Sequence, residues 1–156
     1  MKGTKPETEV IGRKEWAVFP DLQFGPVEAK IDTGAYTTAL HCNDLRLMNE
    51  DGKIILTFKM LEPEHPNYEK QVQKFEHFSV KTIKNSFGDS EKRYIIKTRI
   101  RMGKRKLITT LSLTDRGGMR YPVLIGRKLL RNRFTVNVAE EFMLPQPSLR
   151  KLKKRI

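Results

Sequence analysis

The sequence of 156 residues has one cysteine, no long apolar run and far fewer acidic than basic residues. Because Cys42 is alone, no disulfide can form within the chain, and a reducing, cytoplasmic location is the simplest expectation. No apolar run reaches the roughly 20 residues that a membrane-spanning helix needs, so we expect no membrane association. The polar N-terminus MKGTKPETEV lacks the apolar segment of a signal peptide.

Two common motifs of metal and nucleotide chemistry are also missing. No HExxH sequence is present, and His41, His65 and His77 do not have the spacing of zinc ligands. No GxxxxGK[ST] loop indicates a nucleotide site. We therefore predict no metal and no cofactor, and we interpret His41 as a structural or cleft-lining residue.

The excess of basic residues gives a net charge of +13. One interpretation is a lysine-rich solvated surface. The other is an acidic partner, such as nucleic acid, a ribosomal protein or ribosome surface, anionic lipid or an acidic peptide. Composition does not decide between them.

The pattern of hydrophobic residues indicates an all-β chain. The length fits one domain, and 38% hydrophobic residues suffice for a core. The clearest feature is a hairpin of residues 93–102 and 105–114, whose apolar residues alternate around a Gly103-Lys104 turn. Further strands are expected at 10–19, 27–31, 54–60, 75–83, 123–125 and 134–138, loops at 62–71, 84–92 and 115–122, and one short helix at 127–133. Many short strands with turn signals favour a closed or sandwiched β fold.

The same pattern divides the chain into a flexible N-terminal tail (1–9), one domain (10–144) and a basic C-terminal tail (145–156). The basic tail could bind RNA or an anionic surface. It lacks the aromatic residues that stack on bases, which favours a solvated tail.

The segment IDTGA at 31–35 is the strongest functional signal. Asp32 ends an apolar strand, and Thr33-Gly34 follows where glycine permits a sharp turn. Asp-Thr-Gly alone is common in turns, but here small residues follow it and VLIGRKLL comes about 90 residues later, at 123–130. This combination is much more specific than the triplet.

These segments resemble the retropepsin-like aspartic peptidases. The likeness extends over IGRKEW (11–16), AKIDTGAYTTALH (29–41), TLSLTDRGGMRYPVLIGRKLL (110–130) and FTVNV (134–138). They are similar to a bacterial and archaeal branch often labelled "ATP-dependent zinc protease" and associated with RimK-type glutamate ligases. The resemblance implies a small closed β-barrel with one short helix, and hydrolysis of peptide or isopeptide bonds, with glutamate-rich substrates suggested.

The resemblance also assigns the site residues. Asp32 would be catalytic, and one Asp-Thr-Gly per chain implies a homodimer in which two Asp32 carboxylates share a proton and activate water. Thr33 would hydrogen-bond across the interface, and Gly34 would permit close approach. The supporting residues would be Ala35 beneath the loop, Gly126 passing close under it, and Arg127, for which a structural anchor is favoured over a substrate contact.

Tyr36 departs from this branch, which usually has arginine there. The departure leaves open an inactive binding module with the same barrel, and the basic surface leaves open a ribosome- or RNA-binding protein. The segment 85–93 is either a flap over the cleft or an ordinary surface hairpin. Met119 and Tyr121 are interpreted as core rather than substrate-pocket residues.

Overall fold

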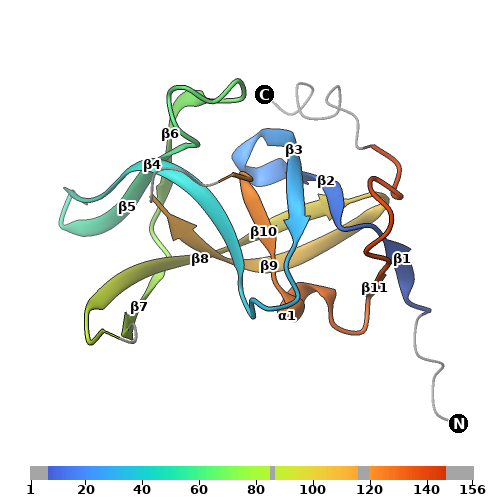
Figure 1. Ribbon diagram of the computed structural model, residues 1–156. Coiled ribbons are helices and arrows are strands. Elements are labelled where there is room, and N and C mark those ends of the chain that lie inside the picture. The colour runs from blue at the N-terminus through green and yellow to red at the C-terminus, as the bar shows by residue number, and fades with distance from the viewer. Residues whose placement is uncertain (1–6, 85–86, 116–119, 147–156) are drawn as a thin grey trace, which may run out of the picture.

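A computed structural model describes residues 7–84, 87–115 and 120–146, and most of them lie in β-strands (Figure 1). The strands are β1 (Glu9–Ile11), β2 (Lys14–Phe19), β3 (Phe24–Ile31), β4 (Thr38–Glu50), β5 (Lys53–Met60), β6 (Glu69–Phe75), β7 (Ser79–Lys84), β8 (Ser90–Met102), β9 (Arg105–Thr114), β10 (Val123–Ile125) and β11 (Phe134–Val136). Two short helices accompany them, the 3-10 helix η1 (Pro20–Leu22) and the α-helix α1 (Arg127–Leu130). Neither described helix is long and apolar enough to cross a membrane.

Six of the described strands close into a barrel, which confirms the predicted all-β barrel with one short α-helix. The strand order is β10-β3-β2-β8-β9-β4, and β10 closes the ring by pairing antiparallel with β4. Inward residues of these strands form one core, including Phe19, Leu40, Ile96, Leu111 and Ile125. The alternation seen in the sequence therefore marks the wall of a closed core.

Several strand predictions are confirmed in detail. The hairpin at 93–114 forms as β8 and β9, paired from Tyr94↔Leu113 to Met102↔Arg105 around the Gly103 turn. β10 covers the predicted 123–125, and β1 with β2 covers nearly all of 10–19. The helix expected over 127–133 ends at Leu130.

Other boundaries differ from the prediction. The strand expected at 75–83 is interrupted after Phe75 and resumes at Ser79, because residues 76–78 turn the chain from β6 to β7. The loop expected at 62–71 ends early, since β6 begins at Glu69. The strand expected at 134–138 ends at Val136, and Val138 is 74% exposed. The described residues do not include 116–119 or 147–156. The first range holds Arg116 and Met119 of the predicted turn, and the second holds most of the predicted basic tail.

A three-stranded extension of β4, β5 and β6 projects from the barrel (Figure 1). The first residues of β4 pair with β9, and the strand then continues into a hairpin with β5. A bulge between Asn43 and Arg46 marks this change, with Asp44 at φ +55°.

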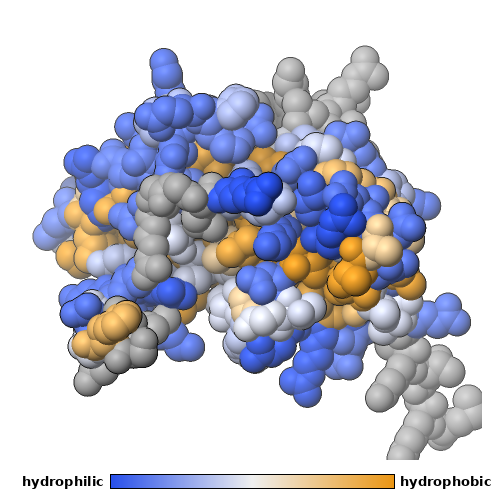
Figure 2. All heavy atoms as spheres, viewed as in Figure 1, coloured by the Kyte–Doolittle hydropathy of each residue, from blue (hydrophilic) through white to orange (hydrophobic). Residues whose placement is uncertain are grey.

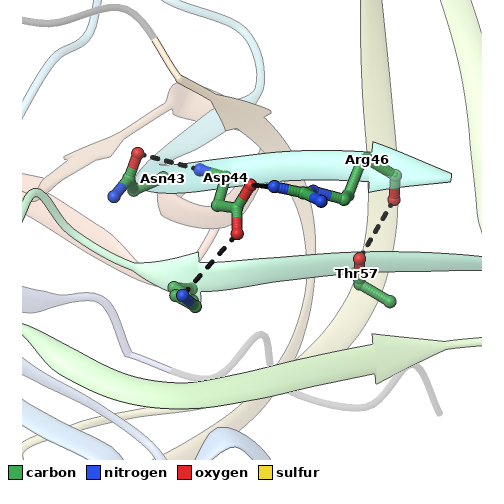
Figure 3. Close-up of polar contacts among 5 residues, drawn as sticks. Asn43, Asp44, Arg46 and Thr57 are labelled. Atoms are coloured by element: carbon green, nitrogen blue, oxygen red, sulfur yellow. Dashed lines mark hydrogen bonds and ion pairs between the residues drawn. The ribbon is translucent and has the colours of Figure 1, made fainter.

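Figure 3 shows the hydrogen bonds that hold this bulge: Asn43 Oδ1 accepts from Asp44 N at 2.9 Å, and Asp44 Oδ1 accepts from Arg46 Nε at 2.8 Å. The hydrogen bond from Arg46 holds the pKa of the Asp44 carboxyl below its usual value.

A second projection is the hairpin of β7 and β8, paired from Ser79↔Ile95 to Lys84↔Ser90. Its tip falls within 85–89, inside the segment interpreted as a flap or a surface hairpin, and Phe87 there is 89% exposed. Residues 85–86 lie outside the described residues, so the flap interpretation remains a prediction.

A buried glutamate joins the end of the described chain to the barrel. Glu15 is 0% exposed, and its Oε2 accepts from Gly12 N at 2.7 Å and from Met143 N at 2.9 Å. Its Oε1 accepts from Leu144 N at 3.0 Å. One carboxylate thus satisfies three backbone donors that no strand ladder pairs.

We predict that Glu15→Ala lowers the free energy of unfolding by about 3 kcal/mol, because three backbone N–H groups lose their acceptor. Urea denaturation should show a lower midpoint with an unchanged slope. Glu64→Ala, at an exposed loop position, is the control and should change stability by less than about 0.5 kcal/mol. Equal midpoints for the two variants would contradict this role of Glu15.

Candidate active site

The Asp32 loop leaves the barrel wall at the end of β3. Asp32 N donates to Ile125 O at 2.9 Å, which extends the parallel ladder between β3 and β10 by one residue. The chain then turns: Ala35 N donates to Asp32 O at 3.2 Å, and Gly34 N donates to Asp32 Oδ1 at 3.1 Å. Asp32 is half-buried, and Thr33 and Gly34 are exposed. The carboxylate therefore lies at the edge of the barrel, where a second group can approach it.

The segment after β10 lies directly against this loop, at the lower edge of Figure 1, where α1 adjoins the connection from β3 to β4. Gly126 is in such close contact that a Cβ there would lie 2.5 Å from Tyr36 O and 2.7 Å from the carbonyl carbon of Thr37. Gly126 N donates to the buried Thr38 Oγ1 at 3.2 Å. Arg127 N donates to Ala35 O at 2.8 Å. The two segments are thus joined through their backbones.

The Arg127 side chain adds further contacts to the same loop. Its Nη1 donates to Thr33 O at 3.3 Å and to Gly34 O at 3.2 Å. Its guanidinium carbon lies 5.5 Å from the centroid of the Tyr36 ring, within the range of a cation–π contact. Tyr36 is 51% exposed and lies on the outside of the loop. Arg127 thus contacts the Asp32 loop through two side-chain hydrogen bonds and one ring contact, and its anchoring role remains a prediction.

An open, mostly apolar pocket of about 390 Å³ lies beside Thr33. Its lining residues come from the loop, α1 and β11: Thr33, Tyr36, Arg127, Leu130, Arg131, Phe134 and Val136. Figure 2 shows apolar surface exposed in this region, over α1 and β11. The pocket places apolar surface next to the residue expected to meet a second copy.

His41 and Cys42 lie away from the loop and are both buried. His41 Nε2 is 3.0 Å from Glu62 Oε1, and burial together with the charge of Asp115 raises the pKa of the Cys42 thiol to about 12. Such a thiol is a poor nucleophile near neutral pH. Among the described residues, no three His, Cys, Asp or Glu side chains are grouped to hold a metal ion, so the zinc named in the branch label has no matching donor set there.

Two contributions to the site region were not predicted. Thr38 is one of the small residues that follow the triplet, and in the structure its hydroxyl accepts from Gly126 N. Tyr121, interpreted as core, is only half-buried, and three cationic side chains surround its ring. The Thr38 contact and the two lysine contacts of Tyr121 have no signal in the sequence, because they join segments that are distant along the chain.

A closed β-barrel whose Asp-Thr-Gly loop rests on a hydrophobic-Gly-helix segment defines a retropepsin-like protein. A family model described as "Retropepsin-like aspartic endopeptidase RimB" matches residues 10–147. The chain therefore belongs to the RimB-like family of retropepsin-like proteins, which confirms the resemblance seen in the sequence.

Similar proteins with curated names are longer than this chain. A "Probable alpha-L-glutamate ligase" of Shewanella pealeana is 34% identical over 86% of this chain and 30% of its own length. One of Desulfotalea psychrophila with the same name is 29% identical over 94% of this chain and 32% of its length. The chain thus spans about a third of these relatives. A crystal structure of a Legionella pneumophila protein of unknown function matches with a TM-score of 0.68 and 25% identity, over 88% of this chain and 98% of that one.

We predict that Gly126→Ala lowers the free energy of unfolding by about 3 kcal/mol, because its Cβ would overlap backbone atoms that cannot move independently of the loop. The measurement is urea denaturation. Gly52→Ala is the control: its Cβ meets nothing within 4 Å, so only its left-handed backbone (φ +83°) contributes, at about 1 kcal/mol. An equal or smaller effect of Gly126→Ala would contradict the close backbone contact.

Proposed function

We propose that this protein is an aspartic endopeptidase whose active site forms between two copies of the chain and hydrolyses peptide or isopeptide bonds, with glutamate-rich substrates. The observation that carries the proposal is the half-buried Asp32 at the end of an Asp-Thr-Gly loop clamped by Gly126 and Arg127. Membership of a family named for aspartic endopeptidases supports it.

The chemistry follows from two carboxylates brought close together. Two Asp32 side chains about 3 Å apart share one proton, because both cannot be ionised at that distance. The ionised carboxylate accepts a proton from a water that attacks the scissile carbonyl carbon. The protonated carboxylate donates a hydrogen bond to the carbonyl oxygen, and a proton then passes to the leaving nitrogen. The pair titrates as a unit.

A twofold homodimer is proposed because each chain has one Asp-Thr-Gly. Thr33 is exposed on the loop, and the apolar pocket beside it provides surface that a second copy would remove from water. Thr33 would hydrogen-bond to the partner loop in this arrangement. Ala35 would pack beneath the loop, and Gly34 would permit the close approach of the two backbones.

The substrate class is proposed from two observations. The relatives that contain a similar segment are named probable glutamate ligases, and this name supports a glutamate-containing chain as the substrate. The net charge of +13 attracts acidic chains over a distance of several ångströms, limited by salt.

We predict that Asp32→Asn abolishes hydrolysis and leaves the protein folded, because an amide can neither share the proton nor accept one from water. The assay is mass spectrometry of poly-glutamylated and generic peptides incubated with each protein at pH about 4 to 8. Unchanged turnover by the variant would remove the mechanism. Complete inactivity of the wild-type protein across these substrates would instead favour a binding module that keeps the barrel, as Tyr36 allows.

A second prediction tests whether one site needs two chains. Adding a ninefold excess of the Asp32→Asn chain under exchange conditions should reduce wild-type activity to about one tenth, because most wild-type chains then pair with an inactive partner. The control adds the same amount of Asp32→Asn with Thr33→Arg, whose bulky charge should prevent pairing, and should leave activity unchanged. Full activity in the first mixture would show that each chain works alone.

A further inference from the structure

Three cationic side chains converge on one aromatic ring on the outer face of the barrel. Lys14 Nζ and Lys30 Nζ each lie 5.7 Å from the centroid of the Tyr121 ring. The guanidinium carbon of Arg120 lies 5.9 Å from it. These residues come from three separate parts of the chain, so the fold gathers like charges that no local sequence feature requires.

Strand register explains how they meet. β3 lies between β2 and β10, with Lys30 directly opposite Lys14 on β2 and beside Leu124 on β10. Leu124, Lys30 and Lys14 therefore form a row across three strands. Tyr121 precedes β10, and the ammonium groups of both lysines lie against its ring. The cluster therefore combines cationic side chains with one aromatic ring.

By strand alternation, this row faces the same side as Asp32, which directly follows β3. Val27, Ala29 and Ile31 are buried in the core, so the alternate position Lys30 points outward. The hydrogen bond from Asp32 N to Ile125 O continues the pairing of β3 with β10 by one residue. The alternation of the strand therefore extends to Asp32, which is two residues after Lys30. Two residues along a strand span about 7 Å. A peptide with its scissile bond at Asp32 would therefore place a side chain one or two residues away over the cluster.

The acidic groups near the cluster neutralise it only in part. Glu141 Oε1 lies 3.6 Å from Lys14 Nζ, but the same oxygen is in closer contact with Arg13. Glu28 is on the same face of β3 as Lys30, one alternation further from Asp32. Within the described part of the chain, no ion pair joins Lys30 or Arg120 to a carboxylate. A ligand carboxylate would supply the missing charge.

We propose that Lys14, Lys30, Arg120 and Tyr121 form a subsite that binds a side-chain carboxylate of the substrate, one or two residues from the scissile bond. The subsite selects glutamate or aspartate there and rests on the proposed peptidase function. The similar branch usually has arginine at the position of Tyr36, and this chain lacks that positive charge. The subsite supplies basic side chains near Asp32 from other elements. The lysines bind the carboxylate, and the Tyr121 ring holds their ammonium groups in place.

The experiment compares a glutamate peptide with its glutamine counterpart, which has the same shape and no charge. Lys30→Gln and Lys14→Gln should each lower kcat/KM for the glutamate peptide about tenfold or more, the effect of losing one charge-assisted hydrogen bond. Hydrolysis of the glutamine peptide should change by less than about threefold. Lys30→Arg should retain most of the selectivity, because it keeps the charge. Thermal unfolding should be unchanged, since Lys30 is exposed.

The control is Lys104→Gln, an equal charge change in the turn between β8 and β9. It should change neither peptide by more than about twofold, since a distant charge is screened by salt. An equal loss of selectivity in Lys104→Gln would show a general attraction and overturn the subsite. So would an equal loss for both peptides in Lys30→Gln and Lys14→Gln.

A binding measurement separates this inference from the proposed hydrolysis. Fluorescence anisotropy of labelled hexaglutamate and hexaglutamine is followed with Asp32→Asn protein, with and without Lys30→Gln. Tighter binding of hexaglutamate, weakened about tenfold by Lys30→Gln, would support the subsite even if the wild-type protein hydrolysed nothing. Equal affinity for the two peptides, or no effect of Lys30→Gln, would overturn the subsite whatever the hydrolysis assay shows.

Discussion

The backbone contact between the Asp32 loop and the segment that begins α1 is the constraint on which the rest of the site depends. A helix as short as Arg127–Leu130 is not stable by itself, and its first N–H groups have no partners within the helix. Here the carbonyls of Ala35 and Tyr36 accept from Arg127 N and Lys128 N. The loop therefore caps the helix while the helix holds the loop, and only glycine at 126 lets the two approach so closely.

The parts of the fold that were predictable from the sequence are those in which one strand face is buried. In β8 and β9 the apolar residues alternate with charged or hydroxyl residues, and the hairpin has the expected register. The edge strand β6 was not predictable, because it reads EKQVQKF and is largely exposed, so no apolar face marks it. The outer half of β4 has the same difficulty: residues 46–50 are all exposed, and the strand is held by pairing with β5.

The site was predictable to the extent that its residues adjoin one another in the chain. Asp32, Thr33 and Gly34 form one triplet, and Gly126 with Arg127 forms the second signal, so a spacing rule finds both. Lys14, Lys30 and Tyr121 have no such rule, because outward lysines on a strand look like any solvated face. Only the register that places Lys14 opposite Lys30 beside β10 brings them together. Glu15 was missed for the same reason, since its partners Met143 and Leu144 lie far along the chain.

The position of Tyr36 shows how anchoring and charge recognition can be separated in this site. The loop conformation depends on backbone groups and on Arg127, which donates to the carbonyls of Thr33 and Gly34. The Tyr36 side chain lies outside this hydrogen-bond network and contacts the guanidinium through its ring. A change of residue at 36 therefore alters the surface beside the loop without removing a hydrogen bond that positions Asp32. The cations gathered at Lys30, on the preceding strand, provide positive charge near the loop from another element, so a tyrosine at this position is compatible with an intact Asp32 loop.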